Sequence, residues 1–179
     1  MCDPPCGGTG SGERLISSDV VVGGEAAWPK DLHTATLPKT DERKFLAAVD
    51  SAGKPVFEAL QRLAKERGLP VHWGSKGFSL NVDLDGQHVA ICFGYPPDAV
   101  YKQSIYTAFG EVRKKVAGAE ALITEYRERF EKVGRPVPAG KELKWVITSP
   151  PAEGELESLI RILSELATAV SEKGLADRP

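Results

Sequence analysis

The strongest constraint on the fold is the segment from Val71 to Tyr95, whose pattern predicts three short antiparallel strands. Within it, Asp85-Gly86 suits the positive φ angles of a two-residue type I′ turn. Pairing the flanking residues symmetrically about this turn puts apolar side chains together on one face. These pairs are Phe78 with Phe93, Leu80 with Ile91, and Val82 with Val89. Two strands that sort into matching apolar and polar faces predict a half-buried hairpin.

The opposite face of the predicted sheet carries polar or small side chains. His72, Ser79 and Cys92 fall in one cross-strand row, and Asp83 faces His88 nearer the turn. A thiol beside an imidazole can act as a nucleophile. In this register, however, Cys92 and His72 lie two strands apart, about 9–10 Å between backbones. The small side chains therefore favour a helix packed over the row, with Cys92 as an apolar filler.

Helix signals lie on both sides of the strands. Thr40 is a suitable N-cap for a first helix, and a second helix is predicted from Pro55 to Arg67, where Gly68 can end it. Apolar residues spaced by three and four from Tyr101 to Val133 predict a long helical region with Asp98 as its N-cap. The alternation in residues 143–147 predicts a fourth strand, and a last helix follows Ser149-Pro150.

Together these elements predict an α+β domain over residues 40–174. It has a small, mostly antiparallel sheet of about four strands packed with helices, in the order helix, helix, three strands, helix, strand, helix. Residues 1–39 are rich in Gly and Pro and predict an irregular arm or the remnant of a linker. Residues 175–179 predict a frayed tail. A chain of 179 residues suits one such domain with a core of ordinary size.

Charge and cysteine content narrow the class of protein. The net charge of −2 argues against a protein that is held on nucleic acid or anionic membrane mainly by bulk charge. The cysteines are odd in number, Cys2, Cys6 and Cys92, and no secretory or membrane-spanning apolar run is present. We therefore expect a cytoplasmic protein without a membrane partner.

Two short motifs near the N-terminus lack the residues that their chemistry needs. Gly7 to Gly12 has glycine spacing like that of a phosphate-binding P-loop, but Glu13 and Arg14 stand where the lysine and the Ser or Thr belong. Cys2 and Cys6 have no second pair of ligands that would indicate zinc. The sequence therefore predicts no cofactor.

The order of elements between residues 55 and 148 resembles the core of restriction-endonuclease-like nucleases. That resemblance implies a metal site with an acid on the second strand and an acid-x-Lys motif on the third. Asp83 can supply the first acid, with Glu58 and His88 as further candidates. The third strand, however, contains neither an acid nor a lysine, so metal-assisted cleavage lacks its ligands. A diverged hydrolase acting on nucleic acid is therefore our second hypothesis.

Our first hypothesis is a non-catalytic binding or assembly module that recognises a protein or nucleic-acid partner. Aromatic side chains interleaved with cations can stack bases and contact phosphates. The aromatic residues Trp73, Tyr95, Tyr101 and Tyr106 surround Lys76, Lys102 and Gln103. Of these, the predicted binding residues are Trp73, Lys76, Tyr95, Tyr101 and Lys102. The apolar faces of the amphipathic helices also allow the chain to form a homo-oligomer.

Overall fold

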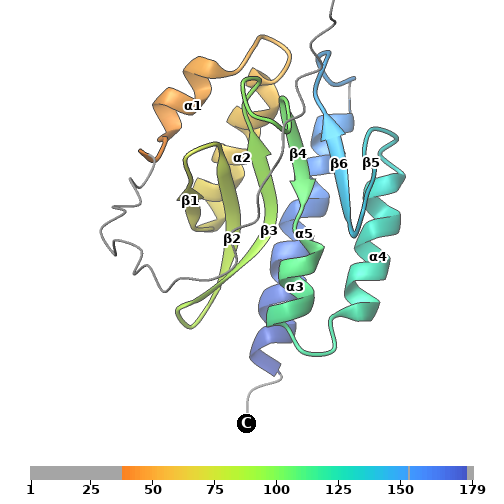
Figure 1. The fold of residues 1–179 in the computed structure, drawn as a ribbon. Helices are drawn as coiled ribbons and strands as arrows, with labels where there is room; N and C mark the ends of the chain where they lie inside the picture. Colours follow the sequence, from red (N-terminus) through yellow and green to blue (C-terminus); the bar gives the residue numbers. More distant parts are fainter. Residues whose placement is uncertain (1–37, 153, 177–179) are drawn as a thin grey trace, which may run out of the picture. The chain divides into compact units, whose positions relative to one another are not determined.

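The computed structural model describes residues 38–152 and 154–176 (Figure 1). Nearly all of the predicted arm lies outside these residues, including Cys2, Cys6 and the glycine-rich run. The last three residues of the predicted tail also lie outside them. None of the helices in the described ranges is long and apolar enough to cross a membrane.

The described chain contains helices and strands in a mixed order. The helices are α1 (Glu42–Ala48), α2 (Lys54–Arg67), α3 (Phe109–Lys115), α4 (Glu120–Glu131) and α5 (Glu155–Ala176). The strands are β1 (Val71–Trp73), β2 (Phe78–Leu84), β3 (Gln87–Tyr95), β4 (Ser104–Thr107), β5 (Val137–Ala139) and β6 (Glu142–Val146).

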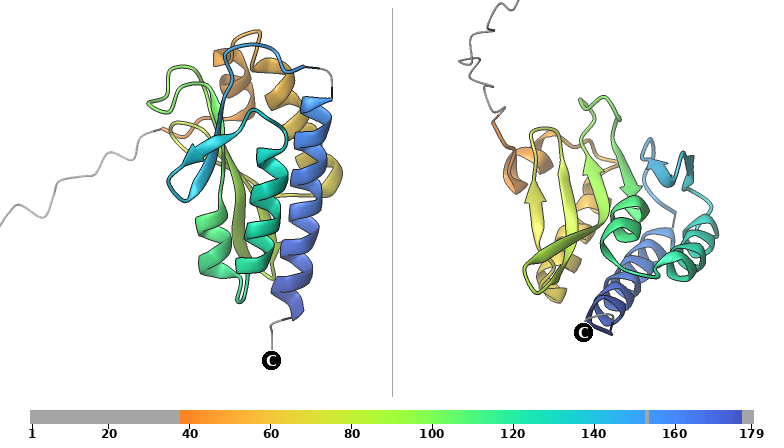
Figure 2. Two further views of the ribbon diagram at one scale, coloured as in Figure 1. Left: turned by 90° about the vertical axis from the view of Figure 1, so that its right-hand side faces the viewer. Right: turned by 60° about the horizontal axis from the view of Figure 1, so that its bottom comes forward.

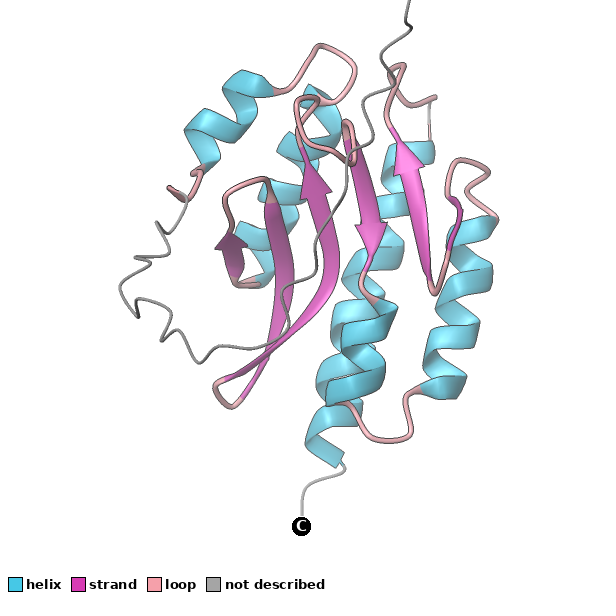
Figure 3. Ribbon diagram, viewed as in Figure 1, coloured by secondary structure: helices cyan, strands magenta, loops and turns pink. Residues whose placement is uncertain are grey.

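All strands belong to one antiparallel sheet with the order β1-β2-β3-β4-β6-β5 (Figure 3). The predicted α+β class is confirmed. The prediction of about four strands is wrong, because β4 and β5 were not expected. The predicted element order is wrong for the same reason: a strand, not a helix, follows β3. The order therefore no longer resembles that of the restriction-endonuclease-like core.

Helices cover one face of the sheet. α5 packs on β2 and β3, with α2 and α4 on either side of it, and α3 packs on β3 beyond the end of β4 (Figures 1 and 2). The largest side chains without solvent exposure lie between the sheet and these helices. They include Phe57, Leu80, Ile91, Phe109, Leu163 and Leu166. In the described chain, the other face of the sheet has no helix layer over it (Figure 2).

The predicted turn at Asp85-Gly86 is confirmed. Both residues have positive φ angles, 51° and 87°, as a type I′ turn requires. The side chain of Asp83 accepts a hydrogen bond of 2.6 Å from the backbone N–H of Gly86. Next to the turn, Val82 pairs with Val89 and Asp83 with His88, as predicted.

Beyond Asn81 the predicted register is wrong. A β-bulge between Leu80 and Asn81 shifts the pairing by one residue, so that Leu80 pairs with Cys92 and Ser79 with Phe93. A bulge places an extra residue in one strand and so reverses which side chains face the core beyond it. The Cys92 side chain is therefore fully buried on the helix-covered face, and Phe93 points to the other face.

The predicted helical region from Asp98 is also wrong at its start. Residues 104–107 form β4, and the helix that follows begins only at Phe109. Gln103 holds this strand in place: its amide nitrogen donates to the side chain of Asp50 at 2.5 Å, and its amide oxygen accepts from the Asp50 backbone at 3.0 Å. The same nitrogen also donates to the Ile147 carbonyl at 3.2 Å, beside β6.

The remaining helix boundaries follow local capping chemistry. The predicted second helix is confirmed, and Gly68 ends it with a φ of 63°. The first helix is capped by Asp41, one residue after the predicted Thr40, through a 2.9 Å bond to the Lys44 N–H. The predicted fourth strand is β6, and the last helix begins at Glu155.

Candidate binding surface on the open sheet

The face of the sheet opposite α2 and α5 carries a continuous row of side chains, one from each of five adjacent strands. From β1 to β6 the partners are His72, Ser79, Phe93, Tyr106 and Lys144. At about 4.8 Å per strand, this row extends about 19 Å across the sheet. We call these residues, together with Tyr95 and Tyr101, the open-face row.

Three tyrosines gather at the centre of this surface. Tyr95 from β3 and Tyr106 from β4 have ring centroids 5.6 Å apart, and the Tyr101 ring lies 4.6 Å from that of Tyr95. The Lys144 Nζ lies 5.3 Å from the centroid of the Tyr106 ring, which is cation–π geometry. The result is an aromatic platform with a cation at one edge.

The surroundings of Tyr95 favour its uncharged phenol. Burial raises the pKa of Tyr95, and the neighbouring Tyr101 and Tyr106 raise it further. The hydroxyl of Tyr95 is therefore a neutral hydrogen-bond donor and acceptor at physiological pH. No negative charge from this residue opposes an anionic ligand.

The loop between β3 and β4 presents Tyr101 in a defined position. The Lys102 backbone N–H donates to the carbonyl of Ala99 at 2.8 Å, and the Ser104 hydroxyl lies 3.0 Å from the carbonyl of Tyr101. Lys102 has a φ of 57°, an uncommon backbone conformation for a residue with a side chain. These contacts hold Tyr101, which is 48% exposed, against the Tyr95 ring.

A shallow hollow of about 380 Å³ continues the surface toward β1. It lies beside Phe93 and Tyr95 and is also lined by His72, Trp73 and Lys76. Lys76 is exposed in the loop between β1 and β2.

Of these residues, Trp73 belongs partly to the core. Its ring lies 5.7 Å from that of Phe45 and 5.3 Å from that of Phe78, both of which are buried. The predicted binding residue Trp73 therefore borders the hollow with only one side of its ring.

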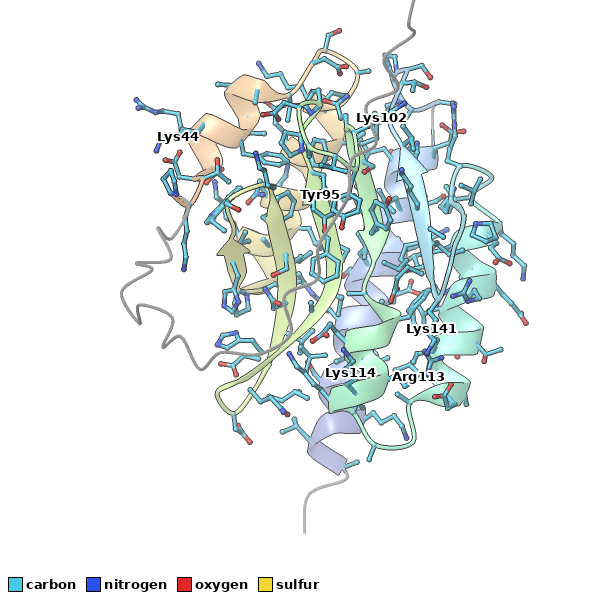
Figure 4. The ribbon with its side chains drawn as sticks, in the orientation of Figure 1. Lys44, Tyr95, Lys102, Arg113, Lys114 and Lys141 are labelled. Atoms are coloured by element: carbon cyan, nitrogen blue, oxygen red, sulfur yellow. The ribbon has the colours of Figure 1, made fainter. Side chains whose placement is uncertain are left out.

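Basic side chains are spread over this side of the molecule. Figure 4 shows Lys102 near Tyr95, whereas Lys44, Arg113, Lys114 and Lys141 lie farther from it. Three of these cations pair with carboxylates: Lys44 with Asp41, Arg113 with Glu120, and Lys114 with Glu111. In the part of the chain that the structure describes, Lys102 and Lys141 form no ion pair.

Glu142 fixes the two strands that carry Tyr106 and Lys144. Its carboxylate accepts hydrogen bonds from the Thr107 hydroxyl at 2.8 Å and from the backbone N–H groups of Phe109 and Gly110 at 2.7 Å each. The Thr107 hydroxyl in turn accepts from the Leu143 N–H at 2.9 Å. These bonds join β6, β4 and the start of α3.

The three residues of the hydrolase hypothesis do not come together. Glu58 lies on α2, on the helical side, 4.0 Å from Lys54, whereas Asp83 and His88 lie on the open face. Among the described residues, no three His, Cys, Asp or Glu side chains are placed to hold a metal ion. His88 instead packs against His72, with ring centroids 4.4 Å apart and the ring planes tilted by 54°.

The structure thus brings together only part of the predicted binding set. Tyr95 and Tyr101 are in contact, and Lys76 and Lys102 lie in the loops that flank them. Tyr106 was among the aromatic residues noted in the sequence, whereas Phe93 and Lys144 were not predicted for this surface. The alternation in Phe93-Gly94-Tyr95 was the available signal for two outward rings.

Comparisons with known protein families, with curated proteins and with solved structures find no match for this chain. The geometry and chemistry of the open-face row therefore give the indication of function. Those features are aromatic rings and lysines, presented on a sheet.

Proposed function

We propose that this protein is a non-catalytic module that binds single-stranded nucleic acid across its open sheet face. The observation that carries the proposal is the alignment of Phe93, Tyr106 and Lys144 on adjacent strands, with Tyr95 and Tyr101 beside them. In one common class of RNA-binding module, aromatic side chains on an open antiparallel sheet stack two or three bases.

Stacking supports a single-stranded ligand over a duplex. Every base has a π-face, so aromatic platforms bind bases with little sequence preference, but only where the bases are not already paired and stacked. Phe93 and Tyr106 are half-buried, cross-strand neighbours on β3 and β4, so part of each side chain is in contact with solvent. Two such neighbours suit two successive bases.

The lysines supply contacts for the phosphates. Lys76 lies beside the hollow and Lys102 follows Tyr101 in the β3–β4 loop. Lys144 lies over the Tyr106 ring. These local cations suit a ligand that is held by stacking and positioned by phosphate contacts, which agrees with the net charge of −2 on the whole chain.

The test is the binding of fluorescently labelled single-stranded RNA and DNA of mixed sequence, about ten nucleotides long, measured by fluorescence anisotropy. We expect Tyr106→Ala and Phe93→Ala each to weaken binding by about 5- to 150-fold, the equivalent of about 1–3 kcal/mol per stacked base. Lys144→Ala weakens binding and lowers its salt dependence.

Lys54→Ala is the matched control, because Lys54 is an exposed lysine on α2, on the helical side. It should bind like the wild type. Failure of the wild-type chain to bind any single strand at low salt contradicts the proposal. If Phe93→Ala and Tyr106→Ala both bind as tightly as the wild type, the assignment of the binding surface is contradicted. Capture of an extended peptide in place of a nucleic acid would show the same face to be a protein-binding site.

A further inference from the structure

A groove on the helical side of the molecule has features that the proposed function does not use. It lies between α2 and α5 and has a volume of about 610 Å³. Its floor is apolar, formed by Ala59 and Leu63 from α2 and by Leu156 and Ile160 from α5. Leu156 and Ile160 are half-buried, so part of each side chain remains in contact with water.

The two helices run side by side in the same direction along this groove. The Arg67 guanidinium, at the end of α2, hydrogen-bonds to the Ser164 carbonyl at 3.5 Å and to the Thr168 hydroxyl, in the middle of α5. The groove-lining residues advance in step from this contact. Because both helices rise about 1.5 Å per residue from the Arg67–Ser164 contact, Ala59 is about level with Leu156 and Leu63 with Ile160.

The rim of the groove carries charges of alternating sign. On α2, Arg62 is followed one turn later by Glu66, and on α5, Glu157 is followed one turn later by Arg161. None of these four side chains forms an ion pair with any residue that the structure describes. Along the chain, α2 therefore presents a positive and then a negative charge, and α5 presents a negative and then a positive charge.

We propose that the groove between α2 and α5 is the interface of a homodimer, with a second copy of this chain as its occupant. The reason is that the rim is complementary to itself. A two-fold axis parallel to the groove brings Arg62 of one copy opposite Glu157 of the other, and Glu66 opposite Arg161. Isologous interfaces need this self-complementarity, because each patch meets its own copy.

A two-fold axis across the groove also pairs opposite charges. It brings Arg62 opposite Glu66 of the second copy, and Glu157 opposite Arg161. An axis along the groove buries the exposed parts of Leu156 and Ile160 against α2 of the second copy, and an axis across the groove buries them against α5 of the second copy. In both arrangements the open-face rows of the two copies point away from the interface, so dimerisation is independent of ligand binding at the sheet.

Sedimentation velocity of the full chain over about 1 to about 100 µM tests the proposal. We expect a concentration-dependent species of twice the 19.3 kDa chain mass. Arg62→Glu alone and Glu157→Arg alone each weaken the dimer by at least about tenfold, because each places like charges opposite one another. The double variant Arg62→Glu/Glu157→Arg restores the dimer if the axis runs along the groove, and Arg62→Glu/Glu66→Arg restores it if the axis runs across.

Arg43→Glu is the matched control, because Arg43 is an exposed arginine on α1 and does not line the groove. It should leave the dimer unchanged. Circular dichroism melts of all variants show whether each one folds. A wild-type chain that stays monomeric throughout the concentration range overturns the proposal. A dimer that is insensitive to the single charge reversals, or one that neither double variant restores, also overturns it.

Discussion

Replacing Glu142 is the perturbation with the clearest structural consequence. Its carboxylate accepts from the Thr107 hydroxyl, the Phe109 N–H and the Gly110 N–H at 2.7–2.8 Å. Phe109 has no solvent exposure and Thr107 is 5% exposed, so water cannot readily replace the lost acceptor at either group. Gly110 is partly exposed, so water can replace the acceptor there.

The magnitude follows from these exposures. A buried donor left without a partner costs about 1–3 kcal/mol. With two such donors, and some relief because the Thr107 hydroxyl can rotate, Glu142→Ala should lower the free energy of unfolding by about 2–4 kcal/mol. Glu142→Gln keeps one acceptor oxygen and should lose about 1–2 kcal/mol. Both losses are large against a typical total of about 5–15 kcal/mol.

Urea unfolding of the wild type and both variants, followed by circular dichroism, measures these differences. Glu128→Ala is the control, because Glu128 is exposed on α4 and its side chain forms no ion pair or hydrogen bond in the described chain. It should stay within about 0.5 kcal/mol of the wild type. An equally small effect for Glu142→Ala would refute the view that this carboxylate joins β4, β6 and α3.

Three further predictions concern the core and the loops. Gly94→Ala places a Cβ 2.4 Å from the Phe78 ring, so urea unfolding should show a loss of about 1–3 kcal/mol; unchanged stability would contradict this packing. Burial raises the pKa of Cys92 to about 12. In a variant whose other cysteines are replaced by serine, the Cys92 thiol should therefore react with a disulfide reagent about a hundredfold more slowly in the folded than in the unfolded protein. Equal reaction rates would contradict its burial. Hydrogen bonds from Gln103 and from the Gly53 N–H lower the pKa of Asp50 below 3.8. The stabilising effect of the Asp50 carboxylate is therefore present above about pH 3.8 and lost as the pH falls through its folded-state pKa. In Asp50→Asn, the urea midpoint of unfolding should depend less on pH at the acid end of the range. The same pH dependence as in the wild type would refute the assignment.

The hairpin was predictable from the turn as far as the β-bulge between Leu80 and Asn81. The Asp85-Gly86 turn and the pairs nearest to it follow from turn chemistry and alternation alone. The bulge did not follow from them, because Ile91 and Cys92 are both apolar and either can face the core. Shifting the register by one residue buried Cys92 and turned Phe93 outward, which removed the predicted His72–Cys92 row.

The missed strand β4 has a different cause. Ile105, Ala108, Phe109 and Val112 are all buried and are spaced like the stripe of a helix, so the pattern favoured a helix across residues 104–107. The backbone there is instead paired on both sides, with β3 and β6. A four-residue strand in the middle of a sheet is too short for its alternation to outweigh that spacing.

The candidate surface was predictable only in outline. The predicted combination of aromatic rings and lysines is present in Tyr95, Tyr101 and Lys102. The pairing of Tyr106 with Lys144 depends on β4 lying next to β6, which are far apart in sequence. Residues from two strands meet only when the topology is known, and the sequence did not reveal that topology.

The most direct test of the central claim is a titration of the isotopically labelled chain with a single-stranded RNA of mixed sequence, followed by NMR of the aromatic and backbone amide groups. We expect the largest shifts at Phe93, Tyr95, Tyr101 and Tyr106, with the groove residues Leu63 and Ile160 unchanged. Shifts confined to the helical side, or no shifts at ligand excess, would contradict the account.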